Sequence, residues 1–570
     1  MMTGAKFREE LRKRLSENAE KTLLRIVRGP DFDSPASFTG NELLERSIRL
    51  AESLELPERA VVLVLMPHCA ELFLLHLGLV LTGRIPAILA WPTSRVDAEK
   101  YQRNLVHQLR NLPADALITL PRLANNLSGP LAYRVLGLLT ENGAAFEKAF
   151  PAGAVGERLD VATEAEGKPA MGEEVLFLQF SGGTTGAQKA IVVTAAMLRH
   201  QLGTLGERLQ FTSGDSVASW LPMYHDMGLI ACLWMALWHG ATSVQISAND
   251  WVLNPELLLK HIEKQSATFC WLPNFAFSYL SQRRELMRGR YRLDSVRGWI
   301  SCSEPVRERS VAEFCEAFAD WGVAKESVQA SYAMAETVFA ITQSEIGAGL
   351  KTVRREQVAQ NGRNYSALAF DLIDEVYVSS GIPIEETEVK IVSEGGATRG
   401  EYEAGEICVR TPSLFSGYWG TQGFQAHTLK DNWHATGDYG FVADGELFVI
   451  GRFKDIVIVG GSNVFPEDVE AVVNTIEGVH AGRVVAFGVE DRDYGTQSLA
   501  VVAEAAEGQE ERDFTSLEAA IRKLVLTAIG IAPRHVLVVP DRWVVKSTAG
   551  KISRRETRER FLREKLQVRI

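Results

Sequence analysis

The sequence predicts an α/β protein: a large N-terminal domain of parallel sheets covered by helices, followed by a small C-terminal α+β domain. Between about residues 38 and 119, and again from 174 to 272, apolar runs alternate with segments of helical periodicity. That alternation is typical of a parallel sheet with helices on its faces. After about residue 400 the apolar runs become short and are separated by Gly and Asp turns. A chain of 570 residues is also too long for a single hydrophobic core.

The N-terminal elements can be assigned run by run. VVLVLM at 61–66 predicts a buried strand, Ala70 to Leu81 a helix, Ile85 to Leu89 a second strand and 114–119 a third. The pattern resumes with strands expected at 174–180, 216–221, 242–247 and 267–272. The most apolar stretch, 61–91, is interrupted by Pro, His, Gly and charged residues. It therefore predicts part of a folded core and no membrane span.

The C-terminal elements differ in kind. GEICVR, GELFVIG and DIVIVGG predict short strands, and PEDVEAVVNTI at 466–476 predicts an amphipathic helix. Two further strands are expected at 484–491 and 499–505. We place the domain boundary at 451–455, which gives a large domain over residues 1–450 and a small one over 456–570.

Composition narrows the class of protein. Lys and Arg total 61 against 72 Asp and Glu, for a net charge of −11, so a nucleic-acid partner is not expected. The six cysteines include no C-x-x-C pair and are interpreted as reduced core thiols. The N-terminus is densely charged and lacks the apolar centre of a signal peptide, so a cytoplasmic location is expected.

The most informative segment is FLQFSGGTTGAQKAIVV at 177–193, where a Gly- and Thr-rich loop joins two apolar strands. Glycines let a backbone approach an anion closely, and hydroxyls and a lysine add donors and positive charge. The spacing is not that of the Walker loop. The alternative interpretation is a plain hairpin turn. The predicted phosphate-binding residues are Ser181, Gly182, Gly183, Thr184, Thr185, Gly186 and Lys189.

Four further motifs follow in a fixed order, and with them the chain resembles the adenylate-forming superfamily of acyl-CoA ligases, peptide-synthetase adenylation domains and luciferases. The motifs are WLPMYHDMGL (220–229), ASYAMAET (330–337), HATGDYGF (434–441) with GRFKDIVIVGG (451–461), and KSTAGK (546–551). The resemblance covers roughly residues 38–565. It departs from the family pattern at Gln188 and Ala190, where Pro and Gly are usual, and at Ala333, where Gly is usual.

This resemblance implies ATP-dependent activation of a carboxylic acid to an acyl-adenylate, with Mg²⁺ as cofactor and pyrophosphate as product. It assigns Tyr332 to the adenine ring and Glu336, together with Thr184, to Mg²⁺. Carboxylate and hydroxyl oxygens suit that hard cation. The segment Ser303, Glu304 and Pro305 is assigned to the adenine pocket. Considered alone, Glu336 could equally be a solvated acid at a helix end.

The remaining nucleotide contacts come from the C-terminal motifs. By resemblance, Asp438 and Arg452 bind the ribose. Lys551 bridges the substrate carboxylate and the α-phosphate, and it is a predicted catalytic residue, as is Lys189. Lys454, two residues beyond Arg452, is the predicted hinge. In isolation, Asp438 could be a turn residue and Lys551 a surface lysine.

The acyl site is expected near His225, Asp226 and Phe275. The first two lie in the PMYHDMG motif that borders the acyl site in the family, although a structural histidine is an alternative. Phe275 lies in FCWLPNFAFSYL (269–280), whose aromatic and apolar residues suit a hydrophobic acid. No rule gives the length of the acid from these residues.

The branch of the family is indicated by the interval between Glu336 and Gly381. Residues 346–380 resemble the insertion that distinguishes fatty acyl-AMP ligases from acyl-CoA ligases, and Ala335 also fits that subfamily. The resemblance implies that a separate acyl carrier protein accepts the acyl group on its phosphopantetheine arm. The alternatives are a CoA ligase with a long loop and a non-catalytic nucleotide-binding homologue.

Overall fold

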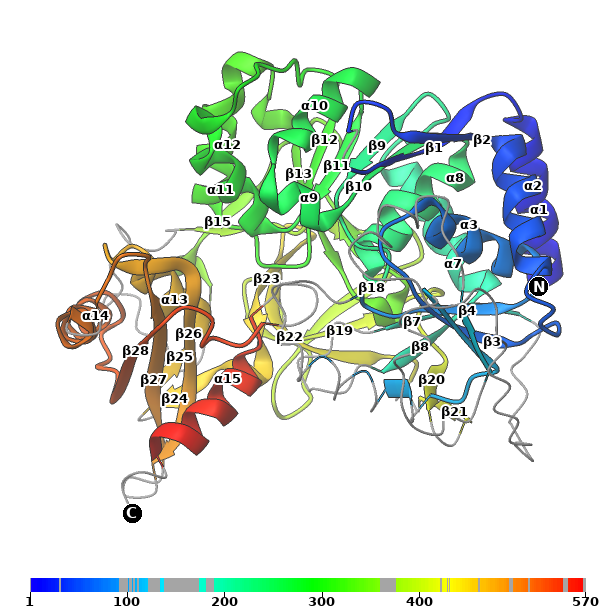
Figure 1. Cartoon of the computed structure of the whole chain (residues 1–570). Helices are drawn as coiled ribbons and strands as arrows, with labels where there is room; N and C mark the ends of the chain where they lie inside the picture. Colours follow the sequence, from blue (N-terminus) through cyan, green and yellow to red (C-terminus); the bar gives the residue numbers. More distant parts are fainter. Residues whose placement is uncertain are drawn as a thin grey trace.

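The structure of the chain is a computed structural model, shown in Figure 1. It describes residues 2–29, 32–91, 101, 105, 108–109, 112–120, 134–137, 174–180, 189–358, 376–420, 423–427, 429, 431–459, 462–491, 496–510, 513–546 and 552–566. The N-terminal part contains two large sheets with helices, and smaller sheets follow toward the C-terminus.

An eight-stranded sheet contains the strand that leads into the predicted phosphate loop. In spatial order its strands are β21 (Gly423–Ala426), β20 (Gly417–Gly420), β8 (Ala190–Thr194), β7 (Val175–Phe180), β4 (Ile85–Ile88), β3 (Val61–Leu65), β5 (Ala116–Thr119) and β6 (Arg134–Gly137). The strands from β7 to β6 run parallel. Every residue of β3, β4, β5 and β7 is buried. Strands buried on both faces read as nearly continuous apolar runs, which is why the sequence marks them clearly.

A nine-stranded sheet carries most of the remaining candidate motifs. Its strands in order are β17 (Ile382–Pro383), β14 (Ala340–Gln343), β13 (Val328–Ala333), β12 (Gly298–Ser301), β11 (Phe269–Leu272), β9 (Ser216–Ser219), β10 (Thr242–Ile246), β1 (Thr22–Val27) and β2 (Ala36–Thr39). The strands from β13 to β1 are parallel, and antiparallel strands flank them at both edges.

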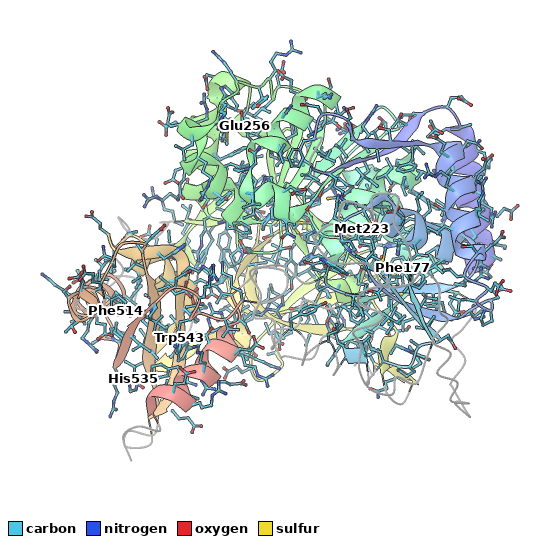
Figure 2. The ribbon with its side chains drawn as sticks, in the orientation of Figure 1. Phe177, Met223, Glu256, Phe514, His535 and Trp543 are labelled. Carbon is cyan, nitrogen blue, oxygen red and sulfur yellow. The ribbon has the colours of Figure 1, made fainter. Side chains whose placement is uncertain are left out.

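Helices cover these sheets and share one core with both of them. They are α1 (Gly4–Glu17), α2 (Gly40–Glu52), α3 (Ala70–Leu81), α7 (Ala195–Arg208), α8 (Met235–His239), α9 (Ala248–Leu253), α10 (Glu256–Gln265), α11 (Asn274–Gln282) and α12 (Glu308–Phe318). Helix α3 is buried from Glu71 to Leu81, as expected for a helix with apolar residues all round. Phe177 and Met223, labelled in Figure 2, both belong to this core.

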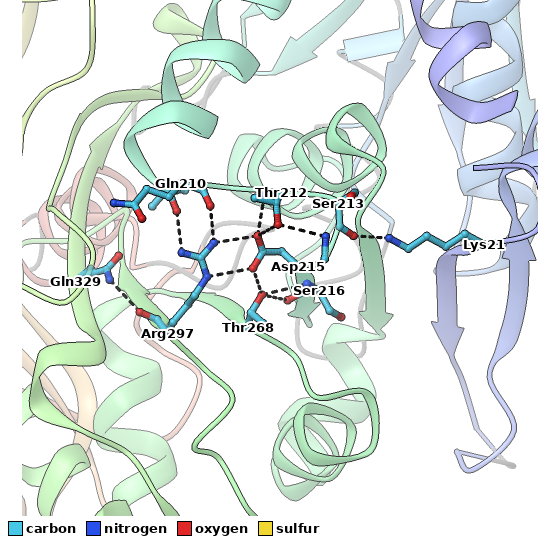
Figure 3. Close-up of polar contacts among 11 residues, drawn as sticks. Lys21, Gln210, Thr212, Ser213, Asp215, Ser216, Thr268, Arg297 and Gln329 are labelled. Atoms are coloured by element: carbon cyan, nitrogen blue, oxygen red, sulfur yellow. Dashed lines mark hydrogen bonds and ion pairs between the residues drawn. The ribbon is translucent and has the colours of Figure 1, made fainter. Parts of the chain in front are cut away.

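A buried carboxylate ties the nine-stranded sheet together at Asp215 (Figure 3). Arg297 donates to it through Nε at 3.1 Å and Nη2 at 2.9 Å, and the hydroxyl of Thr268 donates at 2.8 Å. Burial raises the pKa of Asp215, but the hydrogen bonds from Arg297, Thr212 and Thr268 outweigh it and hold the pKa below its usual value. The network joins the turns that precede β9, β11 and β12, so it fixes the relative positions of these strands.

A four-stranded sheet connects the large sheets to the C-terminal elements. Its order is β18 (Glu388–Val392), β19 (Gly405–Arg410), β22 (His434–Ala443) and β23 (Glu446–Arg452). The pair β15 (Thr352–Arg354) and β16 (Val376–Val378) comes from the two ends of the predicted insertion. Val353, Val358 and Tyr377 of this insertion pack against aromatic residues of β22 and β23.

The C-terminal elements form a cluster at one end of the molecule (Figure 1). They are β24 (Val457–Val459), β25 (Ser462–Val464), α13 (Pro466–Val473), β26 (Val479–Asp491), β27 (Thr496–Ala505), α14 (Phe514–Ile529), β28 (His535–Val539) and α15 (Arg554–Phe561). Two hydrophobic clusters lie wholly within them. Phe514 and Trp543, labelled in Figure 2, pack with the first and the second of these clusters.

The α/β class and the parallel sheets predicted from the sequence are confirmed. The predicted helix at 70–81 has those bounds, whereas the helix predicted at 466–476 ends at Val473. The division at 451–455 stays a prediction. Within the described residues, no helix has both the length and the apolar character needed to cross a membrane.

Candidate functional site

Three predicted nucleotide contacts meet where the side chain of Tyr332, from β13, contacts the β22–β23 pair of the four-stranded sheet. The hydroxyl of Tyr332 donates to Oδ2 of Asp438 at 2.5 Å, and Nε of Arg452 lies 2.8 Å from Oδ1 of the same carboxylate. Asp438 and Arg452 are direct partners in the β22–β23 register. Asp438 is 7% exposed. A buried carboxylate with donors on both oxygens is held in a fixed orientation, as recognition of a pair of ribose hydroxyls requires.

Asp438→Ala is expected to weaken ATP binding by about 10- to 100-fold, the equivalent of one hydrogen bond to a charged group. It also leaves the Tyr332 hydroxyl without its carboxylate partner. The matched control is Glu388→Ala, which removes an exposed acid paired with Arg410 on the same four-stranded sheet. Equilibrium titration with ATP in the absence of acid measures the effect. Equal affinities of the two variants would contradict the ribose assignment.

Glu336 lies in a tight turn, Ala335–Thr337, between β13 and β14. The backbone N–H of Phe415 donates to the carbonyl oxygen of Glu336 at 2.7 Å. The next residue but one, Val338, has a φ of 69°, which is unusual for a β-branched side chain. The turn that carries the predicted metal ligand is therefore held in a conformation that its sequence does not favour by itself.

The electrostatic surroundings of Glu336 fit a cation. Burial raises the pKa of Glu336, and the neighbouring carboxylates of Asp226 and Asp438 raise it further, while Arg452 opposes them. Arg452 offsets part of the repulsion between these acids. Among the described residues there is no cluster of three or more metal-ligating side chains, so Glu336 is a single candidate ligand here. Oxygen donors of this kind are what Mg²⁺ prefers, so the residues present fit the ion that the sequence implies.

Lys189 lies over an aromatic ring of β20. Its Nζ is 4.6 Å from the centre of the Tyr418 ring. Burial and the charge of Glu336 raise the pKa of Tyr418 to about 12, so this phenol stays neutral and keeps its proton. Tyr418, which the sequence analysis gave no role, therefore contacts the predicted phosphate lysine and lies within range of the charge of the predicted metal ligand.

The predicted adenine segment, residues 303–305, contacts Phe275 of the predicted acyl site. Ser303 has a φ of 76°, a left-handed conformation rare outside glycine. The carboxylate Oε2 of Glu304 accepts a hydrogen bond from the backbone N–H of Phe275 at 3.1 Å. Pro305 lies in the loop that follows. The structure therefore brings Phe275 together with the 303–305 segment, which the sequence did not indicate.

The PMYHDMG motif forms a turn that leads into a π-helix, Met227–Trp234. Nδ1 of His225 lies 2.7 Å from Oδ1 of Asp226, and that oxygen also accepts the N–H of Met227 at 2.8 Å. A side chain at Gly228 would lie 2.3 Å from the carbonyl oxygen of Pro222, so only glycine permits this close turn. His225 and Asp226 border a small pocket shared with Gln179 and Met223.

Three aromatic residues, one of them Trp220 of the 220–229 motif, form a wall. Trp220 and Trp251 stack with ring centres 3.8 Å apart and an interplanar angle of 2°. Phe275 meets both indoles edge-on at 6.1 and 6.5 Å. Phe275 itself is 46% exposed, so it offers an apolar edge that a substrate could cover.

The predicted hinge lies directly after Arg452, a predicted ribose contact. Lys454 is the central residue of the short turn Phe453–Asp455. Asp455 accepts a hydrogen bond from Nη1 of Arg554 in α15 at 2.6 Å. Arg554 also pairs with Glu470 and Glu467, so the end of the turn is tied to the C-terminal elements.

Some predicted site residues cannot be placed. Ser181, Gly182, Gly183, Thr184, Thr185, Gly186 and Lys551 lie outside the described residues. The strands that flank the loop are described: β7 ends at Phe180 and pairs with β8, which begins at Ala190. Near Lys551, Lys546 and Ile552 form an isolated antiparallel pair.

The comparisons with known proteins identify the family of the chain. The family model described as "AMP-binding enzyme" matches residues 11–419. The long-chain-fatty-acid–AMP ligase FadD26 of Mycobacterium bovis is 30% identical over 412 residues, which are 68% of this chain and 69% of that protein. The medium-chain-fatty-acid–[acyl-carrier-protein] ligase JamA of Moorena producens is 28% identical over 415 residues, 69% of each chain.

A solved structure from work on fatty acyl-adenylate ligases of E. coli and L. pneumophila has the same fold. It superimposes with a TM-score of 0.80 at 22% identity and covers 100% of this chain and 98% of that one. The family match extends over more than half of the chain. The chain therefore belongs to the AMP-binding enzyme family.

Proposed function

We propose that the protein activates a hydrophobic carboxylic acid, most simply a fatty acid, with ATP. The products of this first step are an acyl-adenylate and pyrophosphate. The acyl group then passes to the phosphopantetheine thiol of a separate carrier protein. The observation that carries the proposal is the pairing of Tyr332, Asp438 and Arg452 near the half-buried acid Glu336. One carboxylate suits the ribose, and the other suits the metal-bound phosphates.

In the proposed reaction a carboxylate oxygen of the acid attacks the α-phosphorus, and the bond to pyrophosphate breaks. No side-chain nucleophile is needed, because the substrate carboxylate is already ionised at neutral pH. The protein aligns the reactants and stabilises charge that develops at phosphorus. Lys551 and Lys189 supply positive charge, and Asp438 fixes the ribose. Mg²⁺, held by Glu336 and Thr184, would neutralise charge on the phosphates.

The relatives support the choice of substrate and acceptor. FadD26 is named for long-chain fatty acids and AMP, and JamA for medium-chain fatty acids and an acyl carrier protein. The aromatic wall of Trp220, Trp251 and Phe275 suits an apolar chain.

Contacts of the insertion support a carrier protein over free CoA. Arg355, at the start of the insertion, is 1% exposed and donates from Nη1 to both carboxylate oxygens of Asp468 at 3.1 Å. Arg307 lies 3.6 Å from the same carboxylate. Asp468 belongs to α13 among the C-terminal elements. These contacts favour one position of the C-terminal elements. A carrier protein has more surface than CoA, so its own contacts can better compensate for the free energy of breaking them.

Acid-dependent exchange of labelled pyrophosphate into ATP tests the first step. A panel of acids of increasing length, with aryl acids included, identifies the preferred substrate. We expect exchange with fatty acids, dependent on Mg²⁺ and abolished by EDTA. A protein that binds ATP but exchanges no pyrophosphate with any acid would instead be a non-catalytic homologue.

Lys454→Pro is expected to spare adenylate formation and block acyl transfer. Proline fixes φ and removes the freedom that a hinge between the two half-reactions needs. Lys454→Ala is the control, because it removes the same side chain and leaves the backbone free. Single-turnover assays measure the two half-reactions separately. If the proline variant lost both equally, the hinge role of this position would be wrong.

A further inference from the structure

Gln179 is a buried amide in β7, two residues before the predicted phosphate loop. It is 4% exposed. Its Nε2 donates to the carbonyl oxygens of Ala335 at 3.1 Å and Val338 at 2.9 Å. These two carbonyls stand on either side of Glu336 in the chain. One side chain therefore joins the strand of the phosphate loop to the turn of the predicted metal ligand.

The turn needs such support. Val338 has φ 69° and ψ −52°, close to the strained γ-turn with positive φ. Backbone strain of this kind persists only where surrounding contacts enforce it, and it occurs often at functional sites. Phe415 holds the carbonyl of Glu336 from one side, and the amide of Gln179 holds the flanking carbonyls from another. Without the amide, two buried carbonyls lose their donor and the strain at Val338 loses an opposing contact.

Simple packing does not account for this glutamine. Its Oε1 is buried and has no hydrogen-bond partner among the described residues. An unpaired buried acceptor is unfavourable, and an apolar residue of equal size would avoid it. What an apolar residue could not supply is the pair of N–H bonds to the Glu336 turn.

We infer that Gln179 is a positioning residue for Glu336, whose carboxylate it holds where the Mg²⁺ of Mg·ATP is bound. The inference rests on the proposed function, because it needs a metal-bound nucleotide at this turn. It extends that function to a residue whose amide donates to the turn of the predicted metal ligand. Its predicted effect is on metal affinity in the nucleotide complex, while contacts to the nucleoside stay as they are.

Gln179→Met tests this, because methionine keeps the length of the side chain and removes the amide. The readout is binding without turnover. Mn²⁺ is titrated into the full-length protein saturated with α,β-methylene-ATP, with no acid present, and free Mn²⁺ is followed by electron paramagnetic resonance. We expect the variant to bind Mn²⁺ about 10- to 100-fold more weakly, the usual loss when a residue that orients a metal ligand is removed. Nucleotide affinity in EDTA should be unchanged.

Gln245→Met is the matched control. Gln245 is also fully buried, donates from Nε2 to the Cys232 carbonyl and the Ser243 hydroxyl, and has an unpaired Oε1 among the described residues. It lies in β10 of the nine-stranded sheet, separated by β12, β11 and β9 from β13, which leads into the Glu336 turn. We expect this variant to bind Mn²⁺ like the wild type. Equal weakening in both variants would show general damage and overturn the inference.

Two further outcomes are distinct. Wild-type metal affinity in Gln179→Met would overturn the positioning role and leave the proposed function intact. Failure of the wild type itself to bind the Mn²⁺–nucleotide complex would instead contradict the proposed function. If Gln179→Met does not fold, Gln179→Leu gives the same comparison, since it is also uncharged and lacks the amide donor.

Discussion

Lys551→Ala is expected to lower adenylate formation by about 10²- to 10³-fold, the scale of losing one charged contact to a transition state. The attack of the carboxylate places negative charge on a five-coordinate phosphorus. A lysine positioned there stabilises the transition state more than the bound substrates. The loss should therefore appear in the rate of exchange at saturating ATP, with little change in ATP affinity.

The control for this prediction is Lys546→Ala, which removes a lysine from the same KSTAGK motif. Lys546 forms an isolated backbone pair with Ile552, so its side chain is not required for that contact. We expect near-wild-type exchange from this control and unchanged thermal unfolding of both variants. Exchange near the wild-type rate in Lys551→Ala would contradict the assignment of this lysine.

Arg355→Met is expected to raise acyl-CoA formation relative to adenylate by about tenfold or more. The buried pair between Arg355 and Asp468 joins the insertion to the C-terminal elements, and breaking a buried pair from one side commonly costs about 3–5 kcal/mol. The unpaired carboxylate of Asp468 is more stable in water than buried, so the variant favours movement of the C-terminal elements away from the insertion. A change of about 1.4 kcal/mol is enough to shift a two-pose equilibrium tenfold.

The neighbouring arginine provides the control. Arg354 is 64% exposed and lies 3.8 Å from Glu356, so Arg354→Met removes an equal charge without disturbing a buried pair. Removing about residues 348–374 should have the same direction of effect as Arg355→Met. Mass spectrometry of products, with CoA and holo-carrier protein offered together, measures the ratio. Abundant acyl-CoA from the unaltered enzyme would mean that it is a CoA ligase with a long loop.

Elements marked by local pattern were predictable from the sequence. Helix α3 has the predicted bounds because a continuous apolar run ends before Gly83, which has a positive φ of 77°. The strands of the parallel sheets were predictable because they are buried on both faces. Irregular elements were placed less well. Strand β26 begins at Val479, ahead of the predicted 484, because an irregular register between Val479 and Val484 lengthens it.

The same distinction applies to the candidate site. Tyr332, Glu336, Asp438 and Arg452 each lie in a local motif, and the fold brings them together. The residues that support them could not be found this way. Gln179 contacts the Glu336 turn across 156 residues of chain, and Arg355 reaches Asp468 across 113. A single sequence has no periodicity that encodes such pairs. The one sequence signal for Gln179 is that it lies two residues before the predicted phosphate loop.

The central claim is that the carboxylate oxygen of the acid attacks the α-phosphorus of ATP. It is tested most directly with a fatty acid labelled with ¹⁸O in its carboxylate, converted by the enzyme with ATP and holo-carrier protein. The adenylate keeps one labelled oxygen as the bridge to phosphorus. When the thiol displaces AMP, that oxygen leaves with it. We predict AMP that carries one ¹⁸O and pyrophosphate that carries none. Label in inorganic phosphate or pyrophosphate, or unlabelled AMP, would contradict the account.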